Sequence, residues 1–160
     1  MKYTDTEVTF IEFPDEISLC INISGCPYRC KNCHSPELQK DIGIELTKQE
    51  LARLIESNKG ISCVGFMGGD SNPSLINTFA SFISNTYPDI KVGWYSGHTK
   101  IPVEISSVWF DYIKIGPYIE EYGPLNNPNT NQRFLAKGKH INKMDASGEL
   151  LYDITDRFWK

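Results

Sequence analysis

The chain has 160 residues, of which 40% are hydrophobic and 22% charged, and its formal net charge at pH 7 is −4. This balance is typical of a soluble globular protein that buries a core without disulfides, so we expect a single domain over residues 1–160. The chain is net negative and lacks the clustered Lys and Arg that neutralise phosphates, which argues against nucleic-acid binding. No apolar run approaches the ~18 residues that span a bilayer, and residues 1–7 lack the layout of a secretory signal. We therefore expect a cytoplasmic protein without membrane contact.

The first predicted strand covers residues 17–24, which alternate and are rich in β-branched side chains. It leads directly into a loop with a C-x3-C-x2-C spacing, formed by Cys26, Cys30 and Cys33. An odd count of five cysteines, three of them close together, indicates metal binding rather than a disulfide framework. Thiolates at this spacing can bind three corners of a cubane [4Fe-4S] cluster, which leaves the fourth iron open to a small molecule.

A structural zinc site with His34 as the fourth ligand is the alternative for this loop. Cys33 and His34 are adjacent, however, which makes tetrahedral ligation by both awkward. Cys20 and Cys63 fall inside predicted strands and have the character of small core residues. We therefore favour the cluster, and His34 is either a residue that hydrogen-bonds near the metal or an ordinary loop histidine.

The middle of the chain alternates between helices and strands. A capping box at residues 47–50 begins an amphipathic helix that extends to about Ser57. The short apolar run at 60–67 predicts a buried parallel strand. An Asn-Pro pair at 72–73 then begins a second amphipathic helix, which ends near residue 87.

Two further strands are predicted at 90–95 and 110–115, with a segment between them that is helical around 102–107. This rhythm is typical of a parallel sheet, whose ligand site lies at the carboxyl ends of its strands. Cys26, Gly68 and Ser96 would all emerge at that edge.

Gly68, Gly69 and Asp70 directly follow the second predicted strand. Glycines let the backbone approach a ligand closely, and a carboxylate can receive the ammonium group of an amino acid. The alternative is a tight turn with Asp70 near a helix N-terminus. Lys114 lies on the face of its strand opposite Asp111 and Ile113, so it is either a ligand-facing cation or a solvated edge charge.

The remainder of the chain is less regular. Residues 118–131 are rich in Pro, Asn and Gly and predict a long loop, a kind of segment that often carries function. Segments 139–143 and 150–155 could form a terminal hairpin. Trp94, Trp109 and Trp159 are interpreted as core or near-core residues.

Together, the cysteine loop and the Gly-Gly-Asp turn resemble the radical S-adenosylmethionine (SAM) superfamily, although the acid of the turn is there more often Glu. Further matches narrow the resemblance to activating proteins of anaerobic ribonucleoside-triphosphate reductase, which are glycyl-radical activases, and it covers nearly the whole chain. The matching segments are residues 33–37, 94–97, 115–118 and 131–134. The chain departs from the more usual activase pattern in having Cys-His-Ser-Pro at 33–36 and Phe-Pro-Asp-Glu at 13–16.

The resemblance implies an α/β fold, a partial parallel β/α barrel with a short C-terminal half. It implies a [4Fe-4S] cluster on Cys26, Cys30 and Cys33, and SAM bound by Gly68, Gly69 and Asp70, with Ser96 at its ribose or carboxylate. The implied partners are the large subunit of the anaerobic reductase, as protein substrate, and an electron donor such as flavodoxin. A small radical SAM enzyme acting on a small molecule, for instance in deazapurine precursor synthesis, and a zinc-binding interaction module are the alternative functions.

Overall fold

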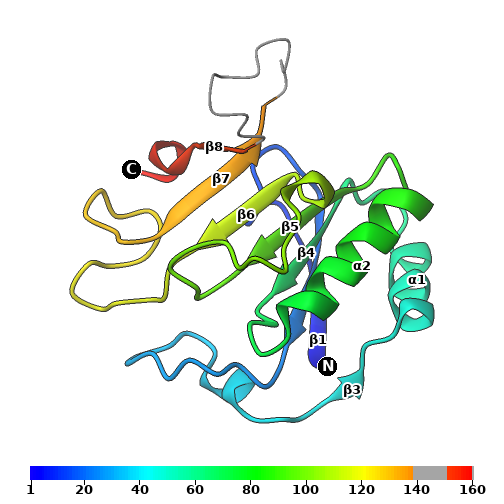
Figure 1. Cartoon of the computed structure of the whole chain (residues 1–160), viewed down its shortest axis with the longest axis horizontal. Coiled ribbons are helices and arrows are strands. Elements are labelled where there is room, and N and C mark those ends of the chain that lie inside the picture. Colours follow the sequence, from blue (N-terminus) through cyan, green and yellow to red (C-terminus); the bar gives the residue numbers. More distant parts are fainter. Residues whose placement is uncertain (139–150, 160) are drawn as a thin grey trace.

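The computed structural model describes residues 1–138 and 151–159. Within them, eight strands form one mixed sheet in the order β3-β1-β2-β4-β5-β6-β7-β8 (Figure 1). The strands are β1 Lys2–Thr9, β2 Ser18–Ile23, β3 Ile44–Glu45, β4 Cys63–Met67, β5 Lys91–Tyr95, β6 Tyr112–Ile115, β7 Arg133–Lys137 and β8 Leu151–Asp153. The helices are α1 Lys48–Ser57 and α2 Pro73–Thr86, with short 3-10 turns η1 Pro36–Gln39, η2 Ser107–Trp109 and η3 Thr155–Phe158.

The centre of the sheet is parallel, as the alternation of elements predicts. Strands β2, β4, β5 and β6 pair side by side in the same direction, and β1, β3, β7 and β8 add antiparallel pairs at the two edges. The four predicted strands and both predicted helices are confirmed. The curvature of a partial barrel stays a prediction.

Two expectations change or fall outside the described residues. The helical segment expected around 102–107 is wrong in type and place, because the chain forms only the 3-10 turn η2 at Ser107–Trp109. Most of the expected terminal hairpin, residues 139–150, lies outside the described residues. The described strand β8 pairs with β7, which the sequence did not predict.

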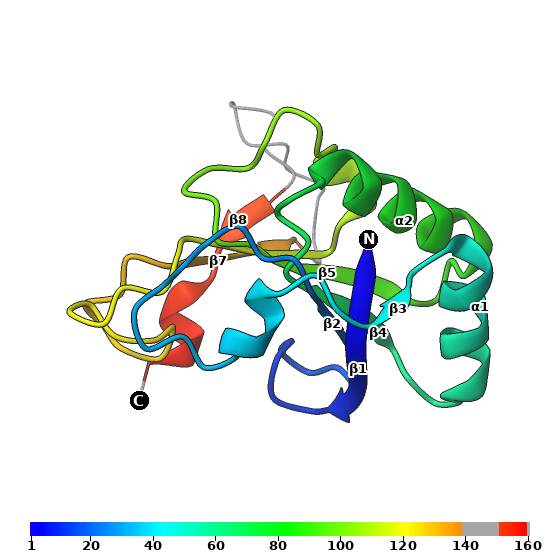
Figure 2. The ribbon, with the colours of Figure 1, turned by 90° about the horizontal axis from the view of Figure 1, so that it is seen from below.

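Helices α1 and α2 cover one face of the sheet, which we call the helix-covered face (Figure 2). Both helices have an N-cap. The Thr47 side chain accepts a hydrogen bond from the amide of Glu50 in α1, and the Asn72 side chain accepts one from the amide of Leu75 in α2, both at 3.1 Å. Each helix then turns its apolar stripe toward the strands. The buried residues of this core include Leu51, Leu54, Ile55, Ile76, Phe79, Ile83, Leu19, Ile21, Ile23, Val64, Phe66, Val92 and Trp94.

The opposite face, which we call the helix-free face, is covered by the loop between β1 and β2. Phe13 of this loop is fully buried and packs on Tyr112 and Phe134, with ring centroids 5.6 and 6.1 Å apart. Gly65 and Gly93 are register partners in β4 and β5, and a β-carbon on either would overlap the Phe13 ring. Two glycines side by side therefore form the seat of the phenylalanine.

A buried polar group closes the end of this face at which the parallel strands begin. Glu16 is 6% exposed and accepts hydrogen bonds from Ser62 Oγ at 2.6 Å and Tyr112 Oη at 2.8 Å. It also forms an ion pair with Lys91, the first residue of β5. Burial raises the pKa of Glu16, but the hydrogen bonds from Lys91, Ser62 and Tyr112 outweigh it, so that this pKa lies below its usual value.

The tryptophans do not all behave as expected. Trp94 is fully buried in the helix-covered core and Trp109 packs partly buried against it, whereas Trp159 is 43% exposed.

In residues 1–138 and 151–159, no helix is long and apolar enough to cross a membrane.

Candidate functional site

A pocket of about 250 Å³ lies at the carboxyl ends of the parallel strands. In Figure 1 the arrowheads of β5 and β6 point toward this edge, where the chain segment after β2 runs. The pocket is lined by Cys26, Cys30 and Cys33 from that segment, by residues of the turn after β4, and by Ser96 after β5. The structure thus brings together the groups that the sequence predicted to emerge at one edge.

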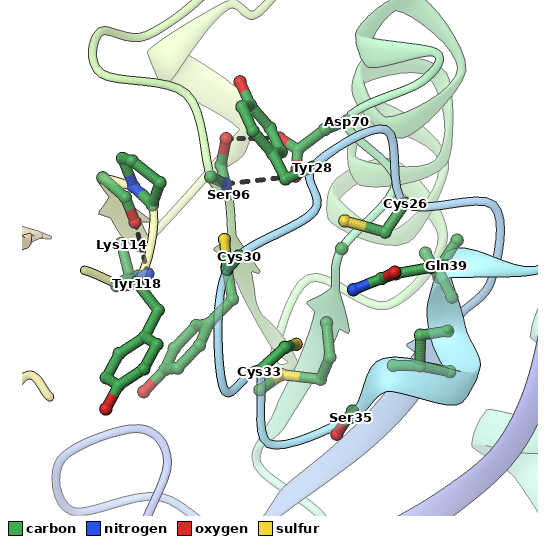
Figure 3. A pocket seen from close by; sticks show the side chains of 18 of the residues that line it. Cys26, Tyr28, Cys30, Cys33, Ser35, Gln39, Asp70, Ser96, Lys114 and Tyr118 are labelled. Carbon is green, nitrogen blue, oxygen red and sulfur yellow. Dashed lines mark hydrogen bonds between the residues drawn. The ribbon is translucent and has the colours of Figure 1, made fainter. Parts of the chain in front are cut away.

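The segment that carries the three cysteines, residues 24–40, is called the cysteine loop. It leaves β2 through Gly25, whose φ of 76° is one that side-chain-bearing residues rarely adopt. The amide of Cys26 donates to the carbonyl of Leu38 at 2.9 Å, so η1 folds back on the start of the loop. Backbone hydrogen bonds therefore fix the loop at both ends, and Figure 3 shows its three cysteines around one space.

The five cysteines fall into two groups, all with free thiols. Cys26, Cys30 and Cys33 are partly exposed in the pocket, whereas Cys20 and Cys63 are buried on the helix-free face. This confirms the prediction that the latter two are core residues. Burial raises the pKa of Cys20 to about 12, which keeps it a thiol at neutral pH.

The donor set of the cysteine loop is three cysteine thiols that line one pocket. Thiolates are the ligands of iron–sulfur clusters, and each cysteine of a cubane binds a different iron. Among residues 1–138 and 151–159, no group of three or more His, Cys, Asp or Glu side chains is placed to hold a single metal ion. Burial raises the pKa of Cys26 and nearby Asp70 acts in the same direction, whereas a backbone hydrogen bond at Tyr28 lowers it.

Asp70 is held from two sides at the bottom of the pocket. It is 7% exposed, and its Oδ1 accepts from Ser96 Oγ at 2.5 Å while its Oδ2 accepts from the amide of Gly97 at 3.0 Å (Figure 3). A carboxylate offers about four acceptor positions, so these two hydrogen bonds leave capacity for a ligand. Ser96 is itself 2% exposed, and its hydroxyl orients Asp70 by donating to the carboxylate.

The two glycines before Asp70 have different surroundings. Gly68 has a φ of 98° and lines the pocket, and its carbonyl accepts from Trp94 Nε1 at 2.8 Å. Gly69, with a φ of 93°, faces the helix-covered core, where a β-carbon would lie 2.5 Å from the Ile76 side chain. Gly69 therefore shapes the turn, and Gly68 is the glycine that a ligand can reach.

The cysteine loop and the turn at 68–70 lie within a segment that matches a known protein family. A family model described as a 4Fe-4S single cluster domain matches residues 17–109, which include all three cysteines of the loop and the turn at 68–70. The chain belongs to this family. It is thus an iron–sulfur protein with a [4Fe-4S] cluster as its cofactor, which favours the cluster over the zinc alternative. Comparisons with curated proteins and with solved structures yield no match.

Lys114 is a buried cation in the wall of this iron–sulfur protein's pocket. It is 8% exposed, and its Nζ donates to the carbonyl of Gly116 at 2.7 Å and lies 5.9 Å from the centroid of the Tyr95 ring. Burial lowers its pKa to about 8, against the opposing effect of Asp70 and Cys30. The interpretation as a solvated edge charge is therefore wrong, and the ligand face of β6 is that of Lys114.

The loop at residues 116–131 closes one side of the pocket and contacts the cysteine loop. Glu120 accepts from Asn32 Nδ2 at 2.5 Å and forms an ion pair with Lys31 at 2.9 Å. The His34 ring packs against Tyr118, with centroids 5.6 Å apart. His34 thus has a structural neighbour that the sequence could not name.

Two site residues were missed by sequence reasoning, namely Tyr28 and His98. Tyr28 lies between the first two cysteines and lines the pocket, and its hydroxyl is 2.9 Å from Nδ1 of His98. His98 follows the Ser96-Gly97 pair that holds Asp70. The position of both residues beside recognised motifs was the only available signal.

Proposed function

We propose that this iron–sulfur protein is a radical SAM activase, which cleaves SAM reductively to generate a glycyl radical on the anaerobic ribonucleoside-triphosphate reductase. The observation that carries this proposal is the shared pocket of the cysteine loop and the turn at Gly68–Asp70. The proposal includes a partial β/α barrel of the radical SAM type as the fold of the sheet.

In this proposal Cys26, Cys30 and Cys33 hold the cluster, and Asp70 receives the ammonium group of SAM. A [4Fe-4S] cluster bound there would supply one electron that breaks the bond between the sulfonium and C5′, yielding methionine and a 5′-deoxyadenosyl radical. The target glycine of the reductase would then give up a hydrogen atom to that radical. The residues of the chain bind and orient SAM for this step, with Gly68 allowing close approach and Ser96 aiming the carboxylate of Asp70.

A protein substrate suits the openness of the site. A second cavity of about 600 Å³ adjoins the pocket and shares Tyr95, Lys114, Tyr118 and Gln132 with it. Reactive radicals require that water be excluded, and a partner seated over these cavities would do so. The large subunit of the reductase is the proposed partner, and an electron donor such as flavodoxin would supply the electron in the cytoplasm.

The test uses the whole chain, purified anaerobically and reconstituted with iron and sulfide. We expect iron and sulfide in the ratio of one [4Fe-4S] cluster, SAM-dependent formation of 5′-deoxyadenosine under reducing conditions, and a glycyl-radical doublet in the electron paramagnetic resonance spectrum when the reductase is added. A reductase variant without its target glycine is the control. Turnover of a small metabolite without a partner would replace the activase by the small-molecule enzyme, and a colourless zinc protein would exclude both.

The role of Asp70 can be tested separately by Asp70→Asn. We expect the cluster to assemble normally and SAM affinity to fall about tenfold or more, because a charge-assisted hydrogen bond contributes about 1.5–3 kcal/mol. Equilibrium SAM binding, measured together with iron content, separates the two effects. Asp89→Asn, at an exposed position outside the pocket, is the matched control. Unchanged SAM affinity would show that the turn at 68–70 is only a turn.

A further inference from the structure

The structure contains a contact chain that joins the cysteine loop to Asp70. The hydroxyl of Tyr28 is 2.9 Å from Nδ1 of His98, and the two rings meet edge to face. On the other side of the same imidazole, Nε2 lies 3.5 Å from Oδ1 of Asp70. One histidine ring thus stands between a residue of the cysteine loop and the acid at the bottom of the pocket.

The backbone around His98 is arranged to bring these groups together. The amide of His98 donates to Ser96 Oγ at 3.0 Å, and the same hydroxyl donates to Asp70. The Tyr28 ring rests directly on Gly97, where a β-carbon would be 2.7 Å from the ring. The segment 96–98 therefore contacts Asp70 through a hydroxyl, an amide and a ring, and contacts the cysteine loop through Tyr28.

One ring nitrogen of His98 is left free to interact with Asp70. Nε2 is buried and makes no hydrogen bond to the described residues, although it is close to Asp70. When the Tyr28 hydroxyl donates to Nδ1, the tautomer that results carries its hydrogen on Nε2, facing Asp70.

We propose that His98 is a positioning residue, which acts through Tyr28 to fix the distance and orientation between the cysteine loop and the carboxylate of Asp70. This inference rests on the proposed function, in which the cluster lies on that loop and the ammonium of SAM on that carboxylate. SAM bridges the two in the proposed complex, so a latch that presets their separation lowers the ordering cost of binding. Neither Tyr28 nor His98 needs to touch the reacting atoms.

The test compares His98→Phe, Tyr28→Phe and the double variant in the reconstituted whole chain. Both substitutions keep an aromatic ring and remove the hydrogen bond between the two side chains. We expect full iron content and an unchanged electron paramagnetic resonance spectrum of the reduced cluster without SAM, while each single variant binds SAM about fivefold to tenfold more weakly. The spectral change that SAM induces should shift to higher SAM concentrations by the same factor.

Non-additivity distinguishes a latch from two independent contacts. If Tyr28 acts through His98, the SAM affinity of the double variant is no lower than that of the single variant with the lower affinity. Tyr87→Phe, which removes a hydroxyl bonded to Glu56 on the surface, is the matched control and should bind SAM normally. Wild-type SAM affinity in His98→Phe, or effects that multiply in the double variant, would overturn the proposal.

A second readout keeps this inference separate from the proposed function. Iron release to an excess of chelator reports how firmly the cysteine loop is held, and it needs no SAM. We expect several-fold faster release from both single variants and no further increase in the double variant. If the wild-type protein binds no SAM, the proposed function fails, and the chelator measurement still decides whether the latch exists: release at the wild-type rate from both variants would show that it does not.

Discussion

The two faces of the central sheet are built in different ways. The helix-covered face is aliphatic, and α1 and α2 come from the chain segments directly before and after β4. The helix-free face is covered by segments from opposite ends of the chain, with Phe13 from the loop after β1 and Phe158 from η3 packing on Phe134. It also buries ionisable groups, Glu16 and Lys114. One face thus supplies local, apolar stability, whereas the other is assembled from residues far apart in sequence and leads into the pocket.

The largest expected effect contrasts the cysteines of the pocket with those of the helix-free face. Replacing Cys26, Cys30 or Cys33 singly by Ala should abolish the binding of cluster iron, because each would remove one ligand of three. Cys20→Ala and Cys63→Ala should retain full iron, since both residues are buried away from the pocket. Iron and sulfide quantification after anaerobic reconstitution checks this. Iron loss in Cys20→Ala or Cys63→Ala, without unfolding, would contradict the division.

The next effect concerns the seat of Phe13. Phe13→Ala should lower the free energy of unfolding by about 3–5 kcal/mol, because it empties the space above two glycines. Gly93→Ala should also destabilise the protein, by about 1–3 kcal/mol, since the added methyl group overlaps the ring. In a Phe13→Ala background, the same methyl group should cost much less. Denaturant unfolding of the four proteins measures this coupling, and strict additivity would show that the seat is not specific.

The smallest effect is the acid sensitivity of the Glu16 ion pair. Its pKa in the folded protein is below the usual 4.5, so the charged group stabilises the fold above that pH, and the contribution is lost as the pH falls through the lower, folded pKa. Glu16→Gln should cost about 1–3 kcal/mol at pH 7 and flatten the decline in stability below pH 4.5. Thermal unfolding from pH 3 to 7 provides the measurement. Glu104→Gln, at an exposed position, should leave the pH profile unchanged.

The helix-covered face was predictable from the sequence because its signals are local. The capping residues Thr47 and Asn72 and the apolar spacing behind them determine α1 and α2 without reference to any other segment. Strand β4 was equally visible, since both of its faces are buried and its sequence is therefore continuously apolar. Strand β5 follows the same pattern after its first residue, Lys91.

The helix-free face was less predictable, because its contacts join segments that are far apart in sequence. Strand β1 lies near the edge of the sheet and carries mostly polar, partly exposed residues, so it lacks a clear apolar pattern. The burial of Lys114 depends on Tyr95 and Gly116, and the contact of Tyr28 with His98 spans 70 positions. The cysteine spacing and the Gly-Gly-Asp turn were visible because each is contiguous in sequence, whereas the contacts between them are not.

The seat of Phe13 also has a consequence for how the molecule folds. The Phe13 ring contacts residues of β4, β5, β6 and β7, so the helix-free face cannot be completed until nearly the whole sheet has formed. Contacts of such large sequence separation carry a high loop-closure entropy and form late, whereas α1, α2 and the strand between them are joined by short loops and can form early. We therefore expect the insertion of Phe13 to be among the last steps of folding, after the central strands are in register.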